Sequence, residues 1–150
     1  MTGRILAVAS GGGHWTQLKR LRPAFEGLDV VYVSVLAGNR EDVPNCRYYT
    51  VMDASRAEKL NFLILVTQCL YVLVRERPNV VITTGSAPGF VMVALAKTIF
   101  RARTMWIDSI ANSEELSLSG RQAGRFADVW LTQWPTLARD DGPRFWGAVL

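Results

Sequence analysis

The fold is decided by residues 4–14, which read RILAVASGGGH. Residues 4–8 are typical of a buried strand, and Trp15, Leu18 and Leu21 follow the glycines at helical spacing. A strand, a glycine turn and a helix start in this order predict a site where backbone N–H groups converge on an anion. A helix N-terminus disfavours imidazolium, so His14, the only histidine, is a candidate general base. The alternative is that His14 merely caps the helix.

Composition restricts the class of protein. We expect one domain over residues 1–150. The net charge of +4 favours anionic partners such as phosphorylated ligands or an acidic membrane surface, whereas dispersed basic residues and the lack of a nucleic-acid motif argue against nucleic acid. Cys46 and Cys69 have no metal or redox spacing, so we expect no metal site and a reduced, cytoplasmic protein.

The remaining chain alternates strand and helix patterns. Strands are predicted at 29–35, 47–51, 79–84, 103–108 and 128–132, helices at 60–74, 90–100 and 117–126, and a loop at 38–45. This alternation predicts an α/β, Rossmann-like parallel sheet with helices on both faces.

The apolar segment 60–74 raises the question of a membrane span. As a helix it would be about 22 Å long, short of the ~30 Å hydrocarbon core, and it contains Asn61 and Gln68. We therefore do not expect a transmembrane helix. The segment either packs under the sheet or dips partly into a membrane interface, and one helix could do both on opposite faces.

Two further loops follow predicted strands, at residues 83–89 (TTGSAPG) and 106–113 (WIDSIANS). In a parallel sheet both share the carboxyl edge with the first glycine loop, where ligands of open α/β sheets bind. The glycines match neither the dinucleotide fingerprint nor the nucleoside-triphosphate loop. Gly85 and Gly89 could instead serve close helix–strand packing. Asp108 and Ser109 could be an ordinary loop start or helix cap.

Three motifs together resemble a known family. They are residues 9–14, residues 84–89, and the segment from Asp108-Ser109-Ile110-Ala111 through LSLSGR at 116–121 to Gln133-Trp134-Pro135. Their order and spacing are similar to the Alg-fourteen family, including bacterial capsule and exopolysaccharide proteins of the PssD type. That family resembles the N-terminal, acceptor-binding half of GT-B glycosyltransferases such as MurG. The resemblance covers residues 5–147.

The resemblance implies half of a split enzyme. The UDP-sugar donor would be held mainly by a second chain of the PssE or Alg-thirteen type, with no cofactor needed. This chain would hold a polyprenyl-diphosphate-linked acceptor at the inner, cytoplasmic face of the membrane as a peripheral protein. The residues it implies are catalytic His14 and Asp108, and acceptor-binding Gly11, Gly12, Gly13, Gly85, Ser86, Gly89 and Ser109. Many relatives carry glutamate where Asp108 stands, which keeps the charge but changes its reach.

Several surface segments are expected to contact the membrane or a partner chain. Helices 60–74 and 90–100 would face the membrane, with Lys97, Arg101 and Arg103 toward lipid phosphates. The late aromatic residues would either anchor the partner chain or close the core; they are Trp130, Trp134, Phe145 and Trp146. Two other functions stay open: a non-catalytic scaffold or activator of a complete glycosyltransferase, and a free-standing nucleotide-binding protein.

Overall fold

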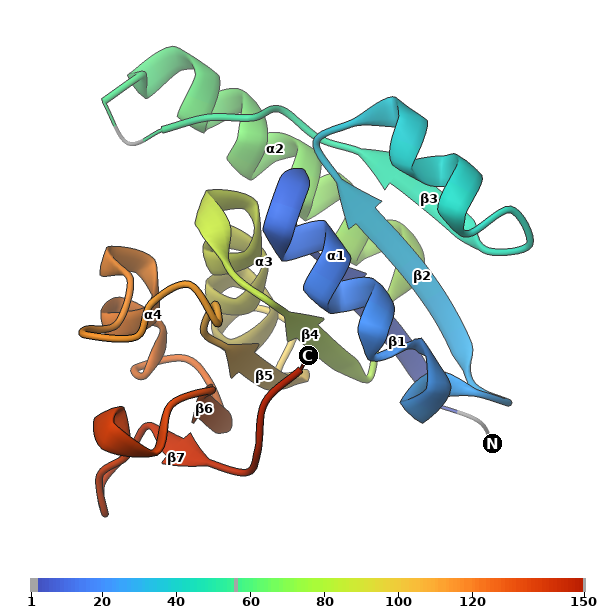
Figure 1. Cartoon of the computed structure of the whole chain (residues 1–150). Coiled ribbons are helices and arrows are strands. Elements are labelled where there is room, and N and C mark those ends of the chain that lie inside the picture. The colour runs from blue at the N-terminus through green and yellow to red at the C-terminus, as the bar shows by residue number, and fades with distance from the viewer. Residues whose placement is uncertain (1–2, 56, 150) are drawn as a thin grey trace.

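A computed structural model describes residues 3–55 and 57–149 of the chain. Its centre is a seven-stranded parallel sheet in the order β3-β2-β1-β4-β5-β6-β7 (Figure 1). The strands are β1 (Arg4–Val8), β2 (Asp29–Ser34), β3 (Arg47–Thr50), β4 (Val80–Thr83), β5 (Arg103–Ile107), β6 (Val129–Thr132) and β7 (Arg144–Phe145). The helices are α1 (Gly12–Arg20), α2 (Lys59–Glu76), α3 (Ser86–Thr98) and α4 (Leu118–Ala123), with short 3₁₀ turns η1 (Arg22–Phe25), η2 (Ala37–Asp42) and η3 (Pro135–Leu137).

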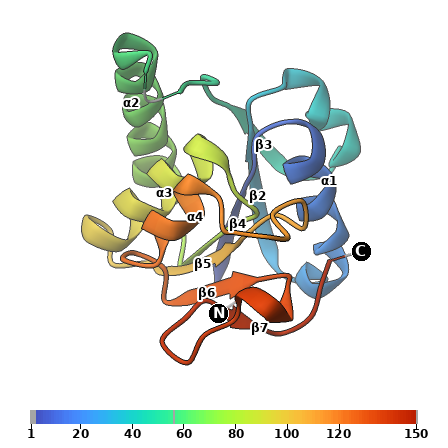
Figure 2. The same ribbon diagram turned by 60° about the vertical axis from the view of Figure 1, so that its left-hand side comes forward.

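Helices cover both faces of the sheet, which confirms the Rossmann-like prediction. Figure 2 shows α2, α3 and α4 on one side and α1 on the other. Alternate residues of β1 enter different cores: Leu6 and Val8 pack with α2 and α3, whereas Ile5 and Ala7 pack with residues of α1. A strand buried on both faces needs apolar side chains at successive positions, as this one has.

The strand order has its reversal between β1 and β4. From β1 the chain proceeds to β2 on one side, and from β4 it proceeds to β5 on the other. The loops that follow β1 and β4 therefore start next to each other at the carboxyl edge, because these two strands are neighbours in parallel register. Ligands of open α/β sheets bind at such a reversal. The fold thus brings the first two predicted loops together.

Several boundaries differ from the predicted ones. α3 begins at Ser86 rather than at residue 90, so the second glycine loop is largely the first turn of a helix. Its proline, Pro88, is tolerated there because the first helical turn leaves its N–H groups without intrahelical acceptors. The loop predicted at 38–45 contains η2. The strand β7 has two residues and is too short to show any periodicity.

Helix α2 has one buried and one exposed apolar side. Leu65, Cys69 and Leu73 are fully buried against the sheet, and burial raises the pKa of the Cys69 thiol to about 12. The opposite side presents an exposed row that we call the outer α2 stripe, made up of Leu60, Leu63, Tyr71 and Val74. In the part of the chain that the structure describes, we find no helix of sufficient length and hydrophobicity to cross a bilayer.

Helix α3 does not face outward as expected for residues 90–100. Met92, Val93 and Ala96 are fully buried, and the helix packs between α2 and α4. Only its last turn, with Lys97, is exposed, and Lys97 forms an ion pair with Asp128. The expectation failed because a helix that is apolar on all sides belongs inside a domain.

An ion-pair cluster fixes the opposite, amino edge of the sheet. Arg4 and Arg47 both bond to Asp29, at 2.8 Å each. The hydrogen bonds from these two guanidinium groups hold the pKa of Asp29 below its ordinary value. Arg47 also lies 2.7 Å from the buried carboxylate of Glu76, the last residue of α2. Charged groups at this edge therefore serve the register of the outer strands.

Candidate active site

His14 is locked to the loop that follows β4 by a reciprocal pair of hydrogen bonds. Its ring Nδ1 lies 2.9 Å from the carbonyl oxygen of Thr84, and the Thr84 hydroxyl donates to the carbonyl oxygen of His14 at 2.7 Å. A carbonyl oxygen only accepts, so Nδ1 must carry the proton. The neutral ring then keeps its lone pair on Nε2, to which none of the described residues hydrogen-bonds. This is the tautomer that a general base needs.

Gly85 makes room for the histidine ring. A Cβ atom at this position would lie 2.8 Å from both Cε1 and Nδ1 of His14, and its φ of +126° is one that side chains rarely adopt. Ser86 follows with a φ of +77°, and its hydroxyl is buried with no hydrogen-bond partner among the described residues. Two successive residues beside His14, Gly85 and Ser86, thus have positive φ angles, and the Ser86 hydroxyl is an unpaired donor.

The first glycine loop is open to solvent where it meets α1. Gly12 has a φ of +62°, and a Cβ on Gly12 or Gly13 would meet no atom within 4 Å. Gly11 precedes the helix, and a Cβ there would lie 2.7 Å from a methyl group of Leu36. Gly11 thus allows a close approach of Leu36, Gly12 supplies a left-handed backbone conformation, and Gly12 and Gly13 leave the loop unobstructed.

Helices α1 and α3 begin at this same edge with free N–H groups. Neither receives a side-chain cap from the described residues, and neither has an acidic residue in its first turn. The unpaired N–H groups and the positive ends of the helix dipoles favour a negatively charged ligand.

Gly89 has a different environment. A Cβ there would lie 2.1 Å from the hydroxyl of Thr83, because α3 packs directly onto the end of β4 at this point. Gly89 is buried and faces the sheet. The structure supports close packing, the alternative interpretation, for this glycine.

Asp108 is buried and fully hydrogen-bonded within its own loop. With 1% of its surface exposed, its carboxylate accepts from the Trp106 indole at 3.1 Å, from the Asn112 amide at 3.0 Å, and from both the backbone N–H (3.0 Å) and the hydroxyl (2.7 Å) of Ser117. The Ser117 hydroxyl in turn caps α4 by accepting from the N–H of Gly120. We call residues 109–117 the β5–α4 loop. The hydrogen bonds of Asp108 to Asn112 and Ser117 hold this loop in place. The hydrogen-bond partner of the His14 ring is Thr84.

Ser109 belongs to a buried amide network that sequence reasoning missed. Its hydroxyl accepts from the side-chain amide of Gln17 at 3.1 Å, and the oxygen of that amide accepts from Gln133 at 2.6 Å. Gln133 directly follows β6, so the rule that polar residues gather at the carboxyl ends of parallel strands would have found it. Gln17 gave no such signal, because a glutamine within a surface helix is ordinarily solvated.

The outer side of α1 is held by η2. The Trp15 indole donates to Asp42 at 2.7 Å, and Lys19 lies 3.0 Å from the same carboxylate. These two interactions, the indole bond first, keep the pKa of Asp42 below its ordinary value. The helix that carries His14 is therefore fixed from outside as well as from the sheet.

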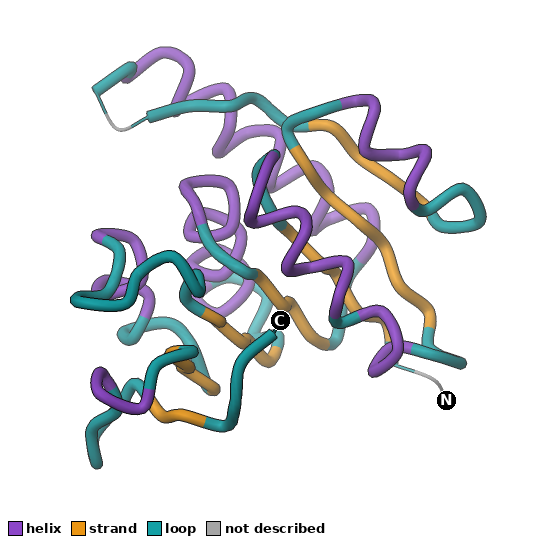
Figure 3. The backbone as a smooth tube through the Cα atoms, in the orientation of Figure 1, coloured by secondary structure: helices purple, strands orange, loops and turns teal. Residues whose placement is uncertain are grey.

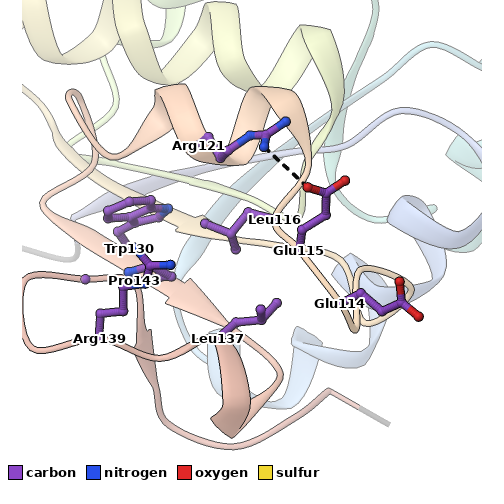
Figure 4. Close-up of a pocket in the computed structure, with 9 residues that line it drawn as sticks. Glu114, Glu115, Leu116, Arg121, Trp130, Leu137, Arg139 and Pro143 are labelled. Carbon is purple, nitrogen blue, oxygen red and sulfur yellow. Dashed lines mark hydrogen bonds and ion pairs between the residues drawn. The ribbon is translucent and has the colours of Figure 1, made fainter.

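A pocket of about 310 Å³ lies on the other side of the β5–α4 loop (Figure 4). It is lined by Glu114, Glu115, Leu116, Arg121, Trp130, Leu137, Arg139, Gly142 and Pro143. None of the residues predicted for the site lines it. The pocket and the glycine loops are therefore separate features, and the β5–α4 loop lines the pocket through Glu114, Glu115 and Leu116.

The late aromatic residues divide into two pairs. The Trp130 ring fits against Gly124 and Gly142, where a Cβ would come within 2.8 Å of the ring, and the Trp134 indole donates to the carbonyl oxygen of Ile110 at 2.7 Å. These two rings are half-buried and pack against their own chain. Phe145 and Trp146 are exposed, Trp146 by 64%.

Solved structures of similar fold define the class of domain. The chain superposes on MurG from Acinetobacter baumannii with a TM-score of 0.74 at 14% identity, covering 91% of this chain and 43% of that one. UDP-N-acetylglucosamine 2-epimerase from Rickettsia bellii gives 0.67 at 13% identity, covering 91% and 40%. The chain is thus a Rossmann-like domain of the kind that forms the N-terminal half of MurG-like GT-B proteins, and it spans less than half of either relative.

The family follows from sequence. Residues 38–149 match the family described as "Oligosaccharide biosynthesis protein Alg14 like", and the chain belongs to that family, as the motifs predicted. A curated relative, "UDP-N-acetylglucosamine transferase subunit ALG14" of Eremothecium gossypii, is 37% identical over 79 residues. That alignment covers 49% of this chain and 35% of the relative, so the aligned part of the chain matches about a third of the relative's length.

Proposed function

We propose that this chain is the acceptor-binding, membrane-recruiting subunit of a two-component, UDP-sugar-dependent glycosyltransferase. Its acceptor is a polyprenyl-diphosphate-linked sugar in exopolysaccharide, capsule or lipid-linked oligosaccharide biosynthesis. The observation that carries the proposal is the Nδ1–H bond of His14 to Thr84, which leaves a basic Nε2 at the strand-order reversal. Membership of the Alg14-like family and the subunit name of the Eremothecium gossypii relative support it.

In the proposed reaction His14 acts as the base. Nε2 takes the proton from the acceptor hydroxyl as the hydroxyl oxygen forms a bond to the anomeric carbon of the donor sugar. The bond from that carbon to UDP breaks, and UDP leaves with the electron pair. The Nδ1–H bond to Thr84 persists through the transfer, so the carbonyl dipole stabilises the imidazolium that forms.

The acceptor diphosphate is proposed to bind where α1 and α3 begin. Gly12 and Gly13 leave the backbone accessible, and Ser86 lies at the same edge as the first residue of α3. Gly11 and Gly85 allow the close approaches that shape this edge. Asp108 and Ser109 contribute by fixing the β5–α4 loop at the same edge.

The donor site is proposed to lie on a second chain, of the PssE or Alg-thirteen type. The word "subunit" in the name of the Eremothecium gossypii relative supports this proposal. Phe145 and Trp146, exposed on and beside the edge strand β7, form a surface suited to a protein partner, because aromatic anchors are enriched at interface centres.

The outer α2 stripe is the proposed membrane contact, on the cytoplasmic face. Leu60 and Leu63 are 71% and 61% exposed, and exposed basic residues flank the stripe at Lys59, Arg75 and Arg77. Apolar side chains inserted at the interface and cations facing anionic headgroups add to the same binding energy.

Replacing Leu60 and Leu63 together by glutamate is expected to weaken vesicle binding roughly 10- to 100-fold, since each leucine contributes on the order of 1 kcal/mol when partly buried. Cosedimentation with vesicles containing anionic phospholipid measures the partition. Leu28→Glu is the matched control, because Leu28 is also exposed but precedes β2, away from α2. Equal binding by the double variant and the control would contradict the membrane assignment.

Reconstitution tests the function as a whole. The chain, its donor-binding partner, a UDP-sugar and a short-chain prenyl-diphosphate sugar are mixed, and transfer is followed by mass spectrometry of the lipid product. We expect product only when both chains are present. Undiminished transfer by the partner alone would instead identify this chain as a scaffold or activator.

A further inference from the structure

We propose that Gln17 and Gln133 are positioning residues that set the β5–α4 loop relative to His14, and that the C-terminal segment controls this setting through Val149. The inference rests on the proposed function in that it takes the β5–α4 loop to border the acceptor. The hydrogen bonds that carry it are independent of any substrate.

The two side-chain amides are buried, and each is hydrogen-bonded through both its oxygen and its nitrogen. Gln17 and Gln133 are 5% and 3% exposed. The Gln17 oxygen accepts from the N–H of Ile110 (3.2 Å) and from Gln133 (2.6 Å), while its nitrogen donates to Ser109 (3.1 Å). The Gln133 nitrogen also donates to the carbonyl oxygen of Asp108 (2.9 Å). Asp108 and the first two residues of the loop, Ser109 and Ile110, are thus fixed by two glutamines.

Gln17 bonds the β5–α4 loop to α1, the helix that carries the proposed base His14. Residues three apart lie on adjacent positions of one helix face, so His14 and Gln17 occupy successive turns of α1. His14 bonds to Thr84 after β4, and Gln17 bonds to Ser109 after β5. Helix α1 therefore holds both loops at once, so a shift of the second loop relative to α1 also moves that loop relative to His14.

Gln133 connects the same loop to the C-terminal segment. Its oxygen accepts from the N–H of Val149 at 2.7 Å, and Arg20 on α1 donates to the carbonyl oxygen of Val149. Figure 3 shows this end of the chain returning across the fold to α1. Residues 144–148 before it are exposed, so Val149 is the fixed end of an accessible strand and tail.

The orientation of the Gln133 amide has no alternative. Turning it over would set its NH₂ against the N–H of Val149 and its oxygen against the Asp108 carbonyl and the Gln17 oxygen. A displacement of Val149 therefore either breaks its hydrogen bond to Gln133 or moves the Gln133 amide. Movement of that amide displaces Asp108 and the loop that follows it, because the amide nitrogen donates to the Asp108 carbonyl. A protein that binds Phe145 and Trp146 would act on the loop by this route.

Two tryptophan indoles report the position of the loop. Trp134 donates to the Ile110 carbonyl and Trp106 to the Asp108 carboxylate, whereas Trp15 donates to Asp42 on the far side of α1. In ¹H–¹⁵N spectra of the full chain, Gln133→Met is expected to shift the Trp134 and Trp106 indole signals and to leave Trp15 unchanged.

A chain that ends at Ala148 removes the bonds of Val149 to Gln133 and to Arg20 but keeps both glutamines, and it is expected to shift the same two signals in the same direction. This second variant leaves the core intact, so the test survives if Gln133→Met folds poorly. Unchanged Trp134 and Trp106 signals in the shortened chain would overturn the coupling.

Kinetics with the partner chain separate positioning from loss of stability. Gln17→Met and Gln133→Met are expected to raise the KM for the lipid acceptor roughly tenfold, the equivalent of about one hydrogen bond, with the KM for the UDP-sugar unchanged. Thr104→Val is the control, because it removes a buried hydrogen bond to Phe126 at the other end of β5 and should lower thermal stability without changing either KM. An unchanged acceptor KM in both glutamine variants would overturn the positioning role. The indole measurements need neither partner nor substrate, so they decide the coupling even if the proposed transfer is not found.

Discussion

His14→Ala is expected to lower transfer by the two-chain enzyme roughly 10²–10⁴-fold, the range typical of losing a positioned general base. The reason is the lone pair on Nε2, which the Nδ1–H bond to Thr84 fixes and which no neighbouring described side chain can replace. The measurement is kcat at saturating UDP-sugar and acceptor. Partner binding and the thermal midpoint should stay close to wild type, because the ring is half-buried and makes one hydrogen bond.

The control for this variant is chemical. His14→Asn places its amide nitrogen at the position of Nδ1, so it can still donate to the Thr84 carbonyl but offers no basic nitrogen, and it should be as inactive as alanine while retaining the loop geometry. If either variant transfers sugar at close to the wild-type rate, His14 is not the base and the scaffold interpretation becomes the better one.

Gly85→Ala is expected to have the second-largest effect. The new methyl group would lie 2.8 Å from two atoms of the His14 ring, and the φ of +126° is strained for alanine. The ring must move off the Thr84 carbonyl, so we expect a loss of transfer approaching that of His14→Ala. Backbone strain of about 1–3 kcal/mol adds a drop in the thermal midpoint of roughly 2–4 °C per kcal/mol.

Gly27→Ala separates the two causes. Gly27 also has a positive φ, +78°, but a Cβ there meets no atom within 4 Å, and it lies between η1 and β2. It should show the loss of stability without the loss of transfer. Full activity in Gly85→Ala would mean that the ring position is not required for the reaction.

Local sequence patterns were sufficient to locate most strands of the sheet. Apolar, β-branched runs bounded by turn residues located six of the seven strands, because the parallel strands at the centre of such a sheet are buried on both faces. The seventh strand forms only because Arg144 and Phe145 pair with β6, which no local pattern records.

The site was predictable only in part. The carboxyl-edge rule brought together His14 and Gly85, but it could not distinguish a glycine that faces a ligand from Gly89, which packs against Thr83. It also could not show that Asp108 turns back into its own loop. The Gln17–Ser109 and Gln17–Gln133 bonds span 92 and 116 residues, so they exist only once the sheet is assembled.

The bond between His14 and Thr84 has a consequence for how such enzymes diversify. Both residues belong to this chain, so the tautomer of the proposed base is set before any partner arrives. A donor-binding chain of different sugar preference could then be exchanged without retuning the base. Under the proposed function, the same acceptor-binding chain could work with different donor-binding chains. The donor-sugar specificity would then be encoded by the gene of the partner chain and could change independently of this one.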